Sequence, residues 1–198
     1  YGFGRSTAQK AVQANKKAVA KNAKKSIIKS LDIDDFMLMS GSHQILPEVA
    51  DVISSVINEY EKKGEIFIFD MSFGEFLDPI TGRPALLQID MNKYGLLVIN
   101  VNDSLLGNKT LNEVDEMIKN IKINLPENLK EAVIHECGHA KAYKGKTAKE
   151  IELMNNDIKD KGVEGISEIA KADGAECIAE VLLSRNSHIP QKAKELYD

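Results

Sequence analysis

Three residues within AVIHECGHAKAY (132–143) have the types and spacing of a metal-dependent hydrolytic site. His135 and His139 are four residues apart, so on a helix both imidazoles lie on one face and can bind a single ion. Zinc binds imidazole nitrogens, and it is catalytic when three protein ligands leave one position open. Glu136 lies about 100° around the helix from His135, where it can act as general base toward a metal-activated water. The spacing predicts zinc-dependent hydrolysis.

The alternative is that two histidines lie one turn apart on an ordinary core or surface helix. The chain contains only four histidines among 198 residues. A pair at this spacing that also includes the required glutamate is therefore uncommon by chance, which favours the metal site.

A catalytic zinc site needs a third protein ligand. The metzincin form of the motif would require a glycine at Ala142 and a histidine at Gly145, so that extension is absent. His43 and His188 are isolated in segments expected to be loops or turns, where a histidine is ordinarily solvated. A downstream acid is the remaining source of the third ligand.

Glu176 and Glu180 are the candidate acids, because residues four apart share one helix face. One can bind zinc while the other accepts the N–H of a ligand histidine, which sets its tautomer and basicity. Structural alternatives exist for both residues. Asp173 and Glu176 fit a capping box at a helix start, and Glu180 fits a solvated helix face.

The motif HECGH, followed by GISEIAKADGAECIAEVLLS (165–184), resembles the zincins whose third ligand is a glutamate. That group includes the anthrax lethal-factor catalytic domain and the clostridial Pro-Pro endopeptidases. Residues 176–180 match their Glu-x-x-Ala-Glu motif, with Glu176 at the metal-ligand position. The resemblance implies a zincin-like metallopeptidase domain with zinc on His135, His139 and Glu176, and with Glu180 in support.

A second resemblance covers the chain from about Asp34 onward. The segments LPEVADVI, GLLVINVN and INLPENLKEAVIHE are similar to a zincin-type C-terminal region of phage minor head (head-morphogenesis) proteins. This resemblance implies a phage setting, with phage head components as further partners.

One position departs from the toxin-like pattern. Ile169 stands where those relatives place a tyrosine that donates to the oxyanion of the tetrahedral intermediate. Loss of such a donor costs on the order of a hundredfold in rate. Tyr143, one turn after His139, is a candidate substitute, and the alternative is that it packs or lies at the surface.

The elements that position these residues can be predicted from the spacing of apolar residues and from the residues that start and end helices or form turns. We expect an α+β fold with a small mixed sheet, an HExxH helix and a C-terminal helix that carries Glu176. In zincins a peptide substrate usually lies extended along an edge strand. Among the expected strands, 95–102 is nearest in sequence to the HExxH helix, and its place in the sheet is left open. The expected helices are 46–62, 111–121, 124–145 and one that includes 173–185, and the expected strands are 65–70, 85–91 and 95–102.

Charge divides the chain into two parts. Residues 1–31 carry eight basic and no acidic side chains, whereas the remainder carries 18 basic and 30 acidic ones. We therefore expect a basic Lys/Ala-rich helical extension at 1–34 and a zincin-like domain at 35–198. The extension is interpreted as a solvated tether, or alternatively as a weak nucleic-acid contact through phosphates.

The function expected from the sequence is that of a zinc-dependent endopeptidase acting on a peptide or protein. The alternative is a phage head interaction module whose zincin fold binds zinc with little or no turnover. Two cysteines, Cys137 and Cys177, exclude a disulfide scaffold and are expected to pack as small apolar groups in a reducing compartment. Without a recognisable signal peptide or transmembrane segment, we expect the chain in the cytoplasm or in a phage virion, with no membrane partner.

Overall fold

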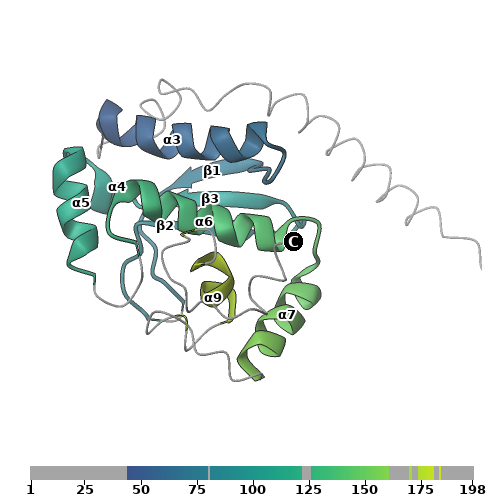
Figure 1. Ribbon diagram of the computed structural model, residues 1–198. Coiled ribbons are helices and arrows are strands. Elements are labelled where there is room, and N and C mark those ends of the chain that lie inside the picture. Colours follow the sequence, from purple (N-terminus) through teal and green to yellow (C-terminus); the bar gives the residue numbers. More distant parts are fainter. Residues whose placement is uncertain are drawn as a thin grey trace, which may run out of the picture. The chain divides into compact units, whose positions relative to one another are not determined.

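The computed structural model describes residues 44–79, 81–121, 126–160, 170, 174–180 and 183. The predicted basic extension at 1–34 lies outside the described residues, as do His43, Ile169, Asp173 and His188. Within the described part, six helices and three strands form a mixed α+β fold (Figure 1). The elements are α3 (Pro47–Lys62), β1 (Asp70–Phe73), β2 (Leu87–Met91), β3 (Leu97–Val101), α4 (Asp103–Leu106), α5 (Leu111–Lys119), α6 (Leu129–Tyr143), α7 (Ala148–Asp160) and α9 (Gly174–Glu180).

The small mixed sheet expected from the sequence is confirmed. Its strand order is β1-β3-β2, with β1 parallel and β2 antiparallel to β3, and Ile99 of β3 aligns with Met71 and Ile89 on its two sides. β3 is therefore the central strand, so the strand nearest in sequence to the HExxH helix is not at an edge of the sheet. In the described part of the chain the edge beside the HExxH helix is β2, because β2 pairs only with β3.

The core lies on one face of this sheet. Alternate strand residues such as Met71, Ile89 and Ile99 are buried there, as strand geometry requires. α3 packs its apolar residues into the same cluster, and α6 contributes Val133 and Ala140. α6 packs against both α3 and β2 (Figure 1), so the HExxH helix is held between a helix and the edge strand.

The first strand begins later than the sequence predicts. The segment 65–70 was expected to be a strand, but β1 starts only at Asp70. The N–H of Ile68 donates to the Glu61 carboxylate at 3.0 Å rather than to a neighbouring strand. Ile66 and Ile68 are nevertheless buried, whereas Phe67 and Phe69 are exposed, so the side chains alternate between core and solvent.

The HExxH helix is also shorter at its start than expected. α6 begins at Leu129, so Pro126 precedes the helix instead of occupying its first turn. Asn128 caps the helix by accepting the N–H of Glu131 at 3.0 Å, and Asp115 accepts the N–H of Leu129 at 2.8 Å. Gly145, with φ of 73°, follows the end of the helix as predicted.

A further helix, α7, follows the HExxH helix at Ala148–Asp160. Its start is set by a reciprocal bond pair: Glu150 accepts the N–H of Thr147 at 2.7 Å, and Thr147 accepts the N–H of Glu150 at 3.3 Å. None of the described helices combines the length and the apolar character needed to cross a membrane.

Candidate metal centre

α6 brings together the three residues that its sequence spacing singled out. His135 and His139 are buried, with 5% and 7% exposure, and their ring centroids are 4.9 Å apart in an edge-to-face arrangement. One ligand atom each from His135, Glu136 and His139 lie within 4.8 Å of one another, a grouping that could hold a metal ion.

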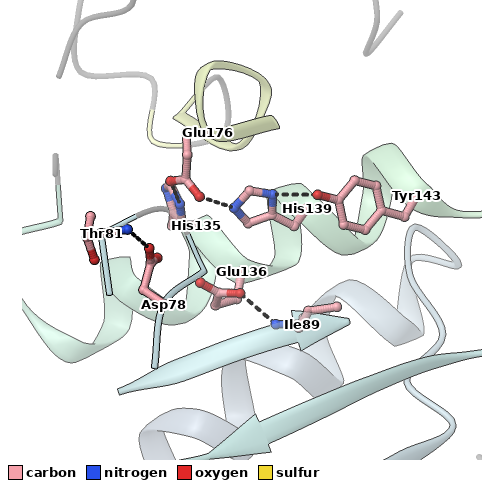
Figure 2. Close-up of polar contacts among 8 residues, drawn as sticks. All are labelled: Asp78, Thr81, Ile89, His135, Glu136, His139, Tyr143 and Glu176. Atoms are coloured by element: carbon pink, nitrogen blue, oxygen red, sulfur yellow. Dashed lines mark hydrogen bonds and ion pairs between the residues drawn. The ribbon is translucent and has the colours of Figure 1, made fainter. Parts of the chain in front are cut away.

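Glu176 reaches the same point from α9. Its Oε2 lies 3.0 Å from Nε2 of His135, and its Oε1 lies 3.2 Å from Nε2 of His139. Figure 2 shows this carboxylate facing both imidazoles, opposite the side of α6 that faces β2. The two nitrogens and the carboxylate come from segments 37 residues apart in sequence, so tertiary packing assembles this donor set.

The electrostatics of Glu176 keep the carboxylate ionised. Burial alone would raise its pKa, but the charge of His139 and hydrogen bonds from both histidines outweigh burial and hold the pKa below its usual range. An anionic carboxylate with two imidazoles is a donor set that catalytic zinc sites use. The residues present therefore fit zinc.

Glu136 faces the sheet rather than α9. The N–H of Ile89 in β2 donates to Glu136 Oε2 at 2.8 Å (Figure 2). Burial of the Glu136 carboxylate raises its pKa, and the positive charge of His139 and His135 opposes this. The edge strand thus fixes the orientation of the predicted general base.

α9 can approach α6 this closely because of Gly138. A β-carbon at position 138 would lie 2.7 Å from the carbonyl oxygen and 2.8 Å from the Cα of Ala179. No side chain fits at that distance without a shift of backbone. Gly138 therefore allows the contact that brings Glu176 to the histidines.

The second nitrogens of the histidines have different surroundings. The Tyr143 hydroxyl lies 3.4 Å from Nδ1 of His139, whereas Nδ1 of His135 is buried with no hydrogen-bond partner among the described residues. Glu180 is completely buried in α9. Its predicted bond to a ligand histidine and the predicted oxyanion role of Tyr143 both stay predictions.

Both cysteines are free and buried, which agrees with their expected role as small apolar groups. Cys137 belongs to the core cluster. Burial raises the pKa of its thiol, and burial together with the charge of Glu180 raises the pKa of Cys177 to about 11. Neither thiol has the lowered pKa of a nucleophile.

A cleft lies beside the donor set and consists of two hollows. The His135-side hollow, of about 210 Å³, extends toward α5, and the His139-side hollow, of about 170 Å³, extends toward α7. Both are lined by Glu136 and Glu176. Open space is therefore present on either side of the candidate metal centre.

Several residues of the site were not identified from the sequence. Gly138 could have been identified from the sequence, because glycine inside a helix is destabilising and often marks the close approach of another element. Ile89 contributes a backbone group, which no residue type reveals. Asp90 and Asn155 line the His139-side hollow, and their strand and helix come together only in the folded chain.

Comparison of the chain with known proteins identifies no relative. No family model matches the chain, and no curated protein or solved structure matches it. The resemblance to glutamate-ligand zincins thus depends on its motifs, and the arrangement of His135, Glu136 and His139 is compatible with a zincin.

Proposed function

We propose that this chain is a zinc-dependent endopeptidase in which His135, His139 and Glu176 hold the metal and Glu136 is the general base. One observation carries the proposal. The Glu176 carboxylate faces Nε2 of both histidines, at 3.0 and 3.2 Å, from a separate helix. A buried carboxylate that converges on two imidazoles across the fold provides the three protein ligands of a catalytic zinc site.

When bound, zinc polarises a peptide carbonyl and lowers the pKa of water. The residues of the chain supply the rest of the chemistry. Glu136 takes the proton of the attacking water and returns it to the leaving amine, for which its position against β2 is suited. Burial of His135 and His139 fixes their rings, so little rearrangement accompanies the reaction.

The hydrogen bond from Ile89 supports this role for Glu136. It orients one carboxylate oxygen toward the sheet, and the other oxygen remains available for proton transfer. The two hollows on either side of Glu136 supply room for a peptide that crosses the site.

The test is peptide cleavage by the zinc-loaded chain, followed by mass spectrometry of a mixed peptide pool. We expect cleavage that a zinc chelator abolishes and added zinc restores. Glu136→Gln should keep one zinc per chain and lose cleavage. Glu152→Gln, at an exposed site on α7, is the matched control and should remain active.

Two outcomes would contradict the proposal. Full activity of Glu136→Gln would exclude the assigned base. Stoichiometric zinc without cleavage of any peptide would favour the alternative, an interaction module that binds zinc without turnover. The phage setting, with head components as partners and the virion as location, is a prediction from resemblance alone, whereas the cytoplasmic location is a prediction from the sequence.

A further inference from the structure

The segment between β1 and β2 forms an arm beside the candidate metal centre. The arm comprises residues 75–86, all of which except residue 80 are described. Backbone hydrogen bonds join its two sides. The N–H of Asp78 donates to the carbonyl of Arg83 at 2.8 Å, and the N–H of Ala85 donates to the carbonyl of Phe76 at 3.3 Å. The arm is therefore a hairpin-like unit with hydrogen bonds of its own.

The arm supplies part of the walls of both hollows. Asp78 and Ala85 line both of them, and Figure 2 shows Asp78 with its bond from the N–H of Thr81, at 2.7 Å. The other arm residues that line one of the hollows are Pro79, Thr81, Arg83, Pro84 and Leu86. A peptide that crosses the cleft would contact the arm, so the position of the arm affects how well the peptide fits.

The base of the arm lies beyond the paired strands. β2 pairs with β3 from Leu87, which aligns with Val101. β3 ends at Val101, and the next residue, Asn102, is the N-cap of α4. The ladder of paired strand residues therefore stops before Ala85, and the chain needs another means of holding this part of the cleft wall.

Asn102 holds the base of the arm. Its Nδ2 donates to the carbonyl of Ala85 at 2.9 Å, and its backbone N–H donates to the carbonyl of Leu86 at 3.0 Å. Its Oδ1 accepts the N–H of Leu105 at 3.2 Å and so caps α4. Asn102 is only 1% exposed, and hydrogen bonds of a buried polar group are costly to lose. One buried side chain thus ties the arm to the start of α4.

The other side of the arm is also attached to α4. Ser104 Oγ donates to the Glu75 carboxylate at 2.9 Å. Glu75 is exposed, so water competes for this bond, and it contributes less than the bonds of Asn102. Both sides of the arm therefore meet the first turn of α4, and Asn102 is the buried attachment.

We propose that Asn102 is a positioning residue that places the arm as a substrate-binding wall of the cleft. It acts through Ala85, whose carbonyl it binds and which lines both hollows. This proposal rests on the proposed function, because it assigns a further residue to the same site. The proposed zinc ligands lie on α6 and α9 and not on the arm. Loss of the attachment should therefore weaken peptide binding and leave zinc binding unchanged.

Two substitutions remove the bond to Ala85 and keep α4 capped. Asn102→Asp replaces the donor with an acceptor, and aspartate caps helices as well as asparagine does. Asn102→Ser also supplies a cap but is too short to replace Nδ2, and it keeps the test valid if a buried charge prevents Asn102→Asp from folding. Ile57→Ala is the matched control, because Ile57 is buried on α3 and lines neither hollow. It lowers stability and removes no bond of the arm.

Hydrogen exchange followed by mass spectrometry tests the attachment without any substrate. In both zinc-loaded Asn102 variants we expect residues 75–86 to exchange about tenfold faster than in the wild type, which corresponds to the loss of one buried hydrogen bond. Exchange in α6 should be unchanged. Ile57→Ala should show no increase confined to the arm.

Steady-state kinetics test whether the arm positions substrate. The substrate is the peptide of the mixed pool that the wild-type chain cleaves fastest. We expect KM to rise about tenfold in both Asn102 variants, with kcat within about twofold of wild type and zinc affinity unchanged. A residue that only stabilised the fold would not separate KM from kcat in this way, and Ile57→Ala should keep the wild-type KM at a temperature where it is folded.

The outcomes separate this inference from the proposed function. Wild-type exchange rates for residues 75–86 in both Asn102 variants would overturn the inference, whether or not the chain cleaves peptides. Faster exchange in the arm with an unchanged KM would overturn it as well. If the wild-type chain cleaves no peptide, the proposed function fails, and faster exchange confined to the arm would still support its attachment by Asn102.

Discussion

Gly138 of α6 and Ala179 of α9 lie in backbone contact. A β-carbon on residue 138 would be 2.7 Å from the Ala179 carbonyl oxygen, closer than real β-carbon contacts allow. On α6 the contact residue lies between His135 and His139 in sequence, and on α9 it lies three residues after Glu176. The close approach of the helices therefore brings the Glu176 carboxylate within reach of both histidines.

Gly138→Ala is expected to destabilise the protein and weaken zinc binding. In an exposed helix this change would stabilise by about 1 kcal/mol, but here overpacking against Ala179 should cost about 1–3 kcal/mol. The shift of α9 should also move Glu176 from the histidines. Denaturant unfolding and competition with a chromophoric zinc chelator measure the two effects.

Lys130→Ala, at an exposed position on α6, is the control and should change the free energy of unfolding by less than about 0.5 kcal/mol. A Gly138→Ala chain more stable than wild type would show that the contact with Ala179 does not constrain the two helices.

Glu176→Ala should abolish tight zinc binding while His135 and His139 stay in place. Loss of groups that only support a ligand already costs about 10–100-fold in affinity, so loss of this carboxylate should cost at least as much. Isothermal titration calorimetry with zinc gives the affinity, and Glu152→Gln is the control. Unchanged affinity would mean that another group provides the third ligand.

Tyr143→Phe discriminates between two roles of the hydroxyl. Its distance of 3.4 Å from Nδ1 of His139 predicts that the hydroxyl orients this histidine, so zinc affinity should fall by up to about tenfold. An oxyanion role would instead lower kcat by roughly a hundredfold with zinc affinity unchanged. Zinc titration and steady-state kinetics on the same variant separate the two results.

Zinc should raise the thermal stability of the chain through the same three ligands. A ligand that binds only the folded state adds about 2.7 kcal/mol at a concentration of one hundred times Kd. We expect Tm to rise with zinc and to return after chelation, and we expect no zinc-dependent rise in His135→Ala. An equal rise in that variant would place the stabilising ion elsewhere on the molecule.

The features that could be predicted correctly are set by residues close together in the sequence. His135, Glu136 and His139 are neighbours on one helix, so their proximity follows from helical spacing alone. The hairpin of β2 and β3 was visible because its turn is local: Gly95, with φ of 76°, donates its N–H to the carbonyl of Asn92 at 2.9 Å.

Long-range packing decided the rest. The sequence marked Glu176 as an acid on a helix, but only the approach of α9 at Gly138 brings its carboxylate to both histidines. The order of the strands could not be predicted from the sequence either, because it depends on contacts between distant segments. β3 is central because β1 and β2 pair with its two sides, which leaves β2 at an edge. The residue types and their local spacing indicate a group that could hold a metal ion. Tertiary contacts between segments far apart in sequence determine which acid lies beside the histidines, which strand is at the edge and where the two hollows lie, because such contacts depend on the shape of the whole core.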